Sequence, residues 1–328
     1  MSSPLFDPVS SPDVAAAARL GQALEASTRG RSLGRLGELA AWIAACQSAS
    51  VPSPFHHPCA VIFAGRHGVA ARGISAFADD AASVCVAELA AGGGPGAVAA
   101  RAAGCGLMLV DDYLTYATRL IDVEDAMSAE EFAAAVDHGK RLADREIDAG
   151  ADLLIAGDVG VGNTTIAATV YGALTRTEPV AVIGRGSGID DETWKRKVCV
   201  IRDAMFRVRN FREDLSRVLA AISAPDFVAL TAFIAQSAVR RTPVLVDATY
   251  TSVATYVAER LAPGTRDWVK VVQLSAEPSH TGAIQALGTT PVLALDITTG
   301  QATGALLTLP LLNAAAEMVG DELSSATA

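Results

Sequence analysis

Aromatic residues and charges are both scarce in this sequence. Phe, Trp and Tyr together make up 5% of the 328 residues and charged residues 19%, whereas hydrophobic residues reach 51%. A chain this apolar is globular rather than disordered, and it is long enough for one large domain or two modest ones with a sizeable core. Because aromatics are few and alanine is abundant, we expect helices that pack closely on a sheet.

The sequence also lacks a basic excess, a cysteine pattern and a long apolar run. Its net charge of −10 argues against a nucleic-acid partner, which requires clustered Lys and Arg. The five cysteines are scattered without metal-type pairing, as suits a reducing compartment. The N-terminus "MSSPLFDPVS" has no basic region, and no uninterrupted apolar run reaches the roughly 18 residues of a membrane span. We therefore expect a cytoplasmic protein with no membrane partner.

Short apolar runs alternate with helical segments beyond residue 58. One such segment, Ala129–Ala149, has helical periodicity and acid-to-base spacings of three to four residues. Continuous apolar strands separated by helices predict an α/β fold with a mostly parallel, Rossmann-like sheet flanked by helices. The six predicted strands are Ala60–Ala64, Leu107–Val110, Leu153–Ala156, Val180–Ile183, Pro243–Val246 and Val271–Leu274.

The two ends of the chain differ from its middle. "VPSPFHHP" (Val51–Pro58) contains three prolines and interrupts the helical pattern that precedes it. Residues 1–50 and about 305–328 are predicted to be helical. Since chain termini are often close in space, we expect them to form a small helical domain. Residues 51–304 would then form a large α/β nucleotide-binding domain.

Glycine-rich loops follow several of the predicted strands. In "GDVGVGNTT" (Gly157–Thr165) a strand leads through glycines into a helix, so backbone N–H groups and the helix dipole face one point. The loop lacks the Gly-Lys-Ser/Thr of a phosphate-loop ATPase and the glycine spacing of a dinucleotide motif. Alone, it is either an anion cradle or a tight turn without a ligand. Four more segments strengthen the first interpretation, because ligands bind at the carboxyl ends of parallel strands: Gly65–Phe77, Gly184–Glu192, Ser275–His280 and Thr298–Pro310. Together they predict a phosphorylated small molecule held mostly by backbone.

Six motifs occur in order over residues 10 to 320: "FAGRHGVAARGISAF", "GADLLIAGDVGVGNTT", "EPVAVIGRGSGIDDE", "RRTPVLVD", "SAEPSH" and "ALGTTPVLALDITTGQATGALLTLPLL". With them the chain resembles the nicotinate-nucleotide:dimethylbenzimidazole phosphoribosyltransferases, which make the lower-ligand nucleotide of cobalamin. The resemblance implies a six-stranded parallel sheet, a small domain from both termini and a homodimer. It also implies transfer of phosphoribose from nicotinate mononucleotide to a benzimidazole ring nitrogen, with no metal and no cofactor.

The resemblance assigns roles to individual residues. Asp158 would hydrogen-bond ribose hydroxyls or steady positive charge at the anomeric carbon; alternatively it is a helix-start acid. Lys197 would contact phosphate or ribose, or else be a solvated surface lysine. His67 would line the acceptor pocket, or else be a turn or core histidine. The phosphate and ribose set is Gly160, Gly162, Asn163, Thr164, Gly184, Arg185, Gly186 and Lys197, and the acceptor pocket set is Arg66, His67, Ser75 and Val84.

The sequence departs from the family pattern on the acceptor side. Gln301 stands where the family has its general base, a glutamate, and glutamine cannot accept a proton. Arg66 replaces an aspartate, Val84 a pocket glutamine and Asp158 a glutamate. Glu277 or Asp296 could substitute for the missing base.

These departures leave two hypotheses for the function. The first is a phosphoribosyltransferase with an altered aromatic acceptor that Gln301 orients. The second is a paralogue without turnover, acting as a nucleotide-binding regulator or as the non-catalytic subunit of a heterodimer.

Overall fold

A five-stranded parallel sheet forms the centre of the computed structural model, which describes residues 4–326. The strand order is β2-β1-β3-β4-β5, and two further strands, β6 and β7, pair in parallel beside it. The α/β class and the parallel sheet are thus confirmed. The bounds are β1 (Pro58–Gly65), β2 (Gly106–Tyr113), β3 (Leu153–Val159), β4 (Val244–Val246), β5 (Val269–Val271), β6 (Gln273–Leu274) and β7 (Leu293–Ala294).

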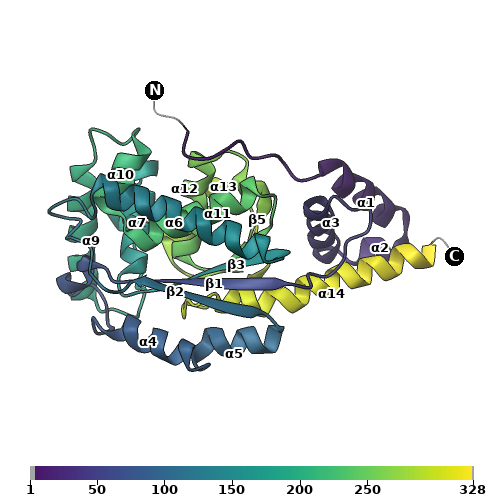
Figure 1. Ribbon diagram of the computed structural model, residues 1–328, viewed down its shortest axis with the longest axis horizontal. Coiled ribbons are helices and arrows are strands. Elements are labelled where there is room, and N and C mark those ends of the chain that lie inside the picture. Colours follow the sequence, from purple (N-terminus) through teal and green to yellow (C-terminus); the bar gives the residue numbers. More distant parts are fainter. Residues whose placement is uncertain (1–3, 327–328) are drawn as a thin grey trace.

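Alternate residues of the strands point to opposite faces of the sheet and build two cores. Val61 and Phe63 of β1 belong to one core, which is covered by α6, α7, α11 and α12, whereas Ile62 of the same strand belongs to the other. That second core is covered by α4, α5 and the first half of α14 (Figure 1). The helix bounds are α4 (Ala81–Ala90), α5 (Gly94–Ala103), α6 (Ala129–Asp148), α7 (Asn163–Thr175), α11 (Pro225–Val239), α12 (Thr249–Leu261) and α14 (Thr303–Ala326).

The predicted strand Val180–Ile183 is wrong, so the main sheet has five strands and not six. The segment forms a single helical turn, α8 (Pro179–Val182), with Glu178 as its N-cap. Proline at the first helical position has its φ already set for a helix and lacks the N–H that would be unpaired there. The remaining helices are α9 (Asp191–Arg207), α10 (Leu215–Ile222) and α13 (Pro278–Leu287), and the 3₁₀ turns are η1 (Gly68–Arg72) and η2 (Thr265–Trp268).

Helices from both ends of the chain pack together at one end of the molecule (Figure 1). These are α1 (Val14–Ala26), α2 (Thr28–Ser32), α3 (Arg35–Gln47) and the second half of α14. They enclose a small core that includes Leu20, Ala40 and Val319. Because the first half of α14 packs on the sheet, this one helix belongs to both regions, and the predicted division into two domains stays a prediction.

One apolar stretch lies largely at the surface. Ala81–Ala103 is long and apolar enough to cross a membrane by length and composition, and only 28% of its most apolar window is buried. In the structure it is two ten-residue helices, α4 and α5, separated by a short turn; Gly92 in this turn and Gly94, the first residue of α5, have positive φ. Each helix is about 15 Å long, half of the roughly 30 Å hydrocarbon thickness of a bilayer.

Candidate active site

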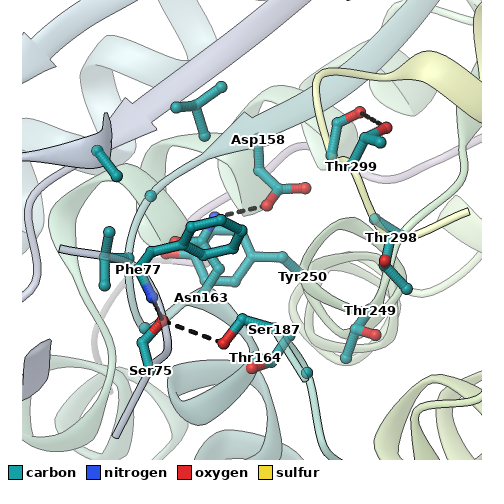
Figure 2. A pocket seen from close by; sticks show the side chains of 18 of the residues that line it. Ser75, Phe77, Asp158, Asn163, Thr164, Ser187, Thr249, Tyr250, Thr298 and Thr299 are labelled. Carbon is teal, nitrogen blue, oxygen red and sulfur yellow. Dashed lines mark hydrogen bonds between the residues drawn. The ribbon is translucent and has the colours of Figure 1, made fainter. Parts of the chain in front are cut away.

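A cavity of about 550 Å³ opens at the carboxyl ends of the strands (Figure 2). Its walls come from the loops that follow β3 and β4, the start of α4 and the segment Ile297–Gln301. This is the edge of a parallel sheet at which ligands bind. Nine of the predicted site residues line it: Ser75, Asp158, Gly160, Gly162, Asn163, Thr164, Gly186, Lys197 and Gln301.

Lys197 is buried in the wall of the cavity. Its side chain on α9 is only 2% exposed, and Nζ donates a hydrogen bond to Thr164 Oγ1 at 2.8 Å. Burial lowers the pKa of this amine, while the nearby Glu277 acts in the opposite direction. The structure therefore excludes the alternative of a solvated surface lysine. A buried ammonium beside a hydroxyl and a glycine loop is suited to bind an anion.

The second glycine loop is held by an acid. The carboxylate of Glu277 accepts hydrogen bonds from the backbone N–H groups of Gly184 at 3.2 Å and Gly186 at 2.6 Å. These amides are therefore occupied, although the sequence predicts that they cradle a phosphate. Arg185 pairs with Asp191 and donates to the Ile189 carbonyl, so its guanidinium is engaged along its own loop and α9.

Asp158 lies in β3, five residues before α7 begins, so it is not a helix-start acid. Its Oδ2 accepts a hydrogen bond from the Asn163 amide, whereas its buried Oδ1 has no hydrogen-bond partner among residues 4–326. Burial raises the pKa of this carboxyl to about 6, although Asn163 and His67 act to lower it. An unpaired carboxyl oxygen with such a pKa can exchange protons near neutral pH.

Gln301 occupies a turn that only a few residue types adopt readily. Gln301 and Ala302 have φ of 60° and 56°, in the left-handed region. The Gln301 N–H donates to the Asp158 carbonyl at 2.9 Å, and Oε1 accepts the N–H of Gly96 at the start of α5, also at 2.9 Å. The side-chain oxygen is thus held at the cavity wall by another helix.

The predicted acceptor pocket is only partly assembled. Ser75 lines the cavity, and its Oγ lies 3.2 Å from that of Ser187. The prediction for Val84 needs correction, because Val84 is 61% exposed on the outer side of α4. Cys85 and Phe77, which the sequence did not single out as site residues, line the cavity. One step along a helix rotates a side chain by about 100°, so an error of a single position exchanges an inner for an outer residue.

Arg66 and His67 are separate from the main cavity. They line a second cavity of about 100 Å³, which shares Ala82 and Val161 with the first. Arg66 is exposed, whereas His67 is buried. This placement favours the alternative of a core histidine, and it moves both residues away from the position expected for acceptor-lining groups.

Asp247 was not predicted from the sequence, and it is a further buried acid near the cavity. It follows β4, and its Oδ2 accepts from the N–H groups of Gly304 at 2.6 Å and Ala305 at 3.2 Å, capping α14. Burial, and then the charge of Asp158, raise its pKa to about 7. Its position directly after a predicted strand was the available signal. Within residues 4–326, no group of three or more His, Cys, Asp or Glu side chains is arranged to hold a metal ion.

Comparison with known proteins identifies the family. A model of a phosphoribosyltransferase family matches residues 9–328. The nicotinate-nucleotide–dimethylbenzimidazole phosphoribosyltransferase of Corynebacterium glutamicum (strain ATCC 13032) is 45% identical over 300 residues, covering 88% of this chain and 84% of the relative. The chain belongs to this phosphoribosyltransferase family.

Other members of the phosphoribosyltransferase family agree over nearly the whole chain. The Mycobacterium ulcerans relative of the same name is 43% identical over 325 residues, covering 94% of this chain and 91% of its own. The crystal structure of CobT from Thermus thermophilus superimposes with a TM-score of 0.86 at 32% identity, covering 93% of this chain and 96% of that one. The resemblance expected from the motifs is therefore confirmed.

Proposed function

We propose that this protein transfers phosphoribose from nicotinate mononucleotide to a ring nitrogen or hydroxyl of an aromatic acceptor such as a benzimidazole. The product would be a cobamide lower-ligand nucleotide of the α-ribazole phosphate type. The observation that carries this proposal is a single cavity that holds a buried ammonium, a glycine loop and a buried acid with a free oxygen, in a chain of this family.

The donor's phosphate would bind at Lys197 and Thr164. Figure 2 shows Thr164 and Ser187 on one side of Tyr250 and Asp158 on the other. The loop Gly160–Thr164 offers backbone N–H groups there, and Lys197 supplies the positive charge. Since Glu277 occupies the Gly184 and Gly186 amides, the second loop would shape this end rather than bind the phosphate directly.

The reaction exchanges one bond at the anomeric carbon. A lone pair of the acceptor nitrogen forms the new bond to C1′, and the bond from C1′ to nicotinate breaks with its electron pair returning to the pyridine nitrogen. Binding both reactants in one cavity makes this displacement effectively intramolecular. The acceptor's second nitrogen then loses its proton to a base, and Gln301, which orients the acceptor in this proposal, cannot accept it.

Asp158 is the best placed of the acids for this proton. Its Oδ1 lies unpaired at the cavity wall in the described part of the chain. Glu277 uses both oxygens on backbone amides, and Asp296 is exposed in the loop before Ile297. The same carboxylate also stabilises positive charge developing at the anomeric carbon.

We propose further that the protein is a cytoplasmic homodimer with small-molecule substrates and no nucleic-acid or membrane partner. The exposed apolar stretch Ala81–Ala103 supports a subunit interface, because monomers rarely leave large apolar patches uncovered. Pairing with a paralogue instead of a second copy is an outcome of the test described below.

A nicotinate-release assay with a panel of acceptors tests the proposed reaction. The wild type should release nicotinate from nicotinate mononucleotide with at least one azole or phenol. Gln301→Glu should raise turnover of dimethylbenzimidazole by about tenfold or more, because a positioned base contributes about 10²–10⁴-fold. The Glu carboxylate could keep the hydrogen bond from Gly96. No release with any acceptor from either protein would contradict the proposal and favour a non-catalytic binding subunit.

A further inference from the structure

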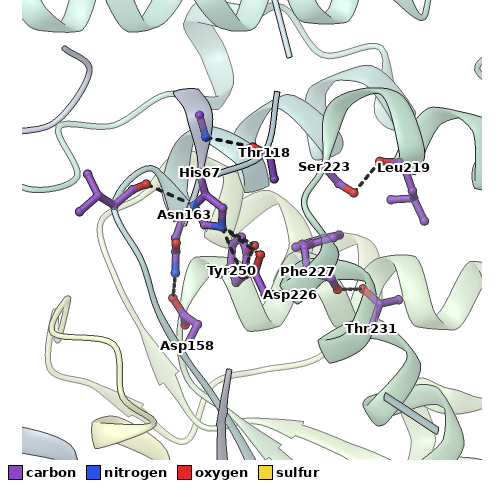
Figure 3. A network of polar contacts seen from close by, with 12 residues as sticks. His67, Thr118, Asp158, Asn163, Leu219, Ser223, Asp226, Phe227, Thr231 and Tyr250 are labelled. Carbon is purple, nitrogen blue, oxygen red and sulfur yellow. Dashed lines mark hydrogen bonds and ion pairs between the residues drawn. The ribbon is translucent and has the colours of Figure 1, made fainter. Parts of the chain in front are cut away.

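Three buried polar side chains meet directly behind the glycine loop (Figure 3). His67 follows β1, Asp226 lies in the first turn of α11, and Tyr250 lies in the first turn of α12. His67 Nε2 is 3.1 Å from Asp226 Oδ1 and 3.2 Å from Oδ2, and the Tyr250 hydroxyl donates to Asp226 Oδ2 at 2.8 Å. All three are at most 2% exposed.

The partners of His67 determine where its protons are. Nδ1 lies 3.2 Å from the carbonyl oxygen of Val161, which can only accept, so Nδ1 carries a hydrogen. Nε2 faces a carboxylate whose Oδ2 already accepts from Tyr250. The arrangement fits a ring in which both nitrogens donate, that is, an imidazolium paired with the Asp226 carboxylate.

This ion pair lies against the loop that lines the cavity. Val161 stands between Gly160 and Gly162, and a Cβ at Gly160 would approach His67 Cε1 to 3.0 Å. A Cβ at Gly65 would lie 2.3 Å from the Asp226 carboxyl carbon. Because glycine has no Cβ at these positions, the loop, the ring and the carboxylate can lie in close contact, so a shift of the ring would displace the loop.

We propose that His67 is a positioning residue for the transfer reaction: as an imidazolium held by Asp226 and Tyr250, it fixes the Val161 carbonyl and provides a permanent positive charge behind Asp158. The expected effect of His67 on the reaction rests on the proposed function. The expected protonation state of His67 is independent of that function.

Electrostatics agree with this geometry. Burial acts to lower the pKa of His67, but the charge and hydrogen bond of Asp226, the Val161 carbonyl and the charge of Asp158 together raise it. In return, His67 acts to lower the pKa of Asp158, against burial and Asp226, which raise it. The groups that face the pair are thus Asp158 from β3 and Tyr250 from α12, with Tyr113 of β2 also interacting with Asp226.

A buried pair has a characteristic response to substitution. Removing one partner leaves an unpaired buried charge, whereas removing both leaves two neutral groups. We therefore expect Asp226→Asn to destabilise the protein more than the double change Asp226→Asn with His67→Gln. Tyr250→Phe keeps the ring and loses one hydrogen bond, so it should have the smallest effect of the three.

The first experiment is ¹⁵N NMR of the histidine rings in the wild-type protein at pH 8. His67, assigned by its loss in His67→Gln, should give the signals of an imidazolium. A neutral His67 ring at pH 8 would overturn the proposal. This measurement does not require turnover, and a variant is needed only to assign the signal, so its failure is distinct from failure of the proposed function. Tyr250→Phe provides a second assignment, because it should shift the same signal.

The second experiment measures nicotinate release as a function of pH. His67→Gln should raise KM for nicotinate mononucleotide about tenfold, because the loop is released. It should also move the acid limb of the kcat profile to higher pH, because loss of a nearby positive charge raises the pKa of Asp158. Tyr250→Phe removes one hydrogen bond to the Asp226 carboxylate and leaves the His67–Asp226 pair in place, so it should raise KM less than His67→Gln does. An unchanged KM with an unmoved acid limb would show that the pair only supports the fold.

Discussion

At the scale of single residues, the most informative position is Gln301. Its left-handed backbone and its hydrogen bond to Gly96 hold a side-chain oxygen at the cavity wall regardless of whether that side chain is an amide or an acid. Because a carboxylate oxygen can accept the same N–H, we expect a glutamate here to keep this geometry and to differ in its ability to accept a proton. Asp158, the cavity-lining acid with an unpaired oxygen, then becomes the group whose ionisation matters, and activity should decline below about pH 6.

Lys197 provides a direct test of the phosphate end. Lys197→Ala should weaken binding of nicotinate mononucleotide by about tenfold or more, because it removes a charge-assisted hydrogen bond from a buried ammonium. The increase in thermal midpoint on adding the nucleotide measures this binding. Lys195→Ala, two positions away and exposed on the same helix, is the matched control. An equal increase in thermal midpoint in both variants would show that Lys197 does not bind the nucleotide.

Asp247 predicts a pH dependence of stability. Its pKa is about 7 when folded against 3.8 in the reference state, so the folded protein binds more protons between about pH 4 and 7 and its stability falls as pH rises through that window. The unfolding free energy of the wild type should be lower at pH 8 than at pH 5. In Asp247→Asn this difference should be smaller by about 2 kcal/mol. Urea denaturation at the two pH values measures this.

A control for Asp247 exists at another helix start. Asp214 is the exposed N-cap of α10, and Asp214→Asn tests the loss of a capping carboxylate at the surface. If both variants keep the wild-type difference between pH 5 and 8, the titration of Asp247 does not contribute to stability.

The sequence alone predicted those site residues whose neighbours in space are also close in the chain. Asn163 and Thr164 were predicted because strand, glycine loop and helix start follow each other in the chain. Asp226 and Tyr250 lie in the first turns of α11 and α12, and they reach His67 only through the packing of these two helices. Contacts of this kind depend on tertiary proximity, which a single sequence does not display.

At the scale of elements, runs of four apolar residues were the weakest basis for prediction. Leu153–Ala156 is a strand because neighbouring strands cover it on both edges, whereas Val180–Ile183, equally apolar, begins with a proline turn and is a helix. Length and hydrophobicity do not separate these cases; the preceding Glu-Pro does. The sheet's class followed from the alternation of elements, and its strand count required the structure.

The contact between α5 and the Gln301 turn can be tested with glycine substitutions. A Cβ at Gly96 would lie 2.7 Å from Gln301 Cβ, so Gly96→Ala should destabilise the protein by about 1–3 kcal/mol and displace Gln301. Gly21 is also helical, and a Cβ there meets nothing within 4 Å. Gly21→Ala should instead stabilise by about 0.5–1 kcal/mol. Urea midpoints that move in the same direction would contradict this account.

At the scale of the whole molecule, the proposed homodimer can be tested directly. Light scattering should give twice the 33.7 kDa monomer mass at micromolar concentration. Val84→Glu with Val98→Glu, on the exposed sides of α4 and α5, should shift the protein toward monomer because charges would be buried in the interface. Val180→Glu, similarly exposed on α8, is the control. A wild-type monomer that pairs only with an added paralogue would favour the heterodimer.

The position of α14 has a mechanical consequence. The helix begins two residues after Gln301, and its 24 residues extend about 36 Å to the small core shared with α1 and α3. This one helix therefore connects the cavity wall to the terminal helices (Figure 1). A small rotation of those helices would translate Gln301 and its bond to Gly96. Insertions or truncations at the chain ends, remote from the substrates, should accordingly alter turnover more than nucleotide binding.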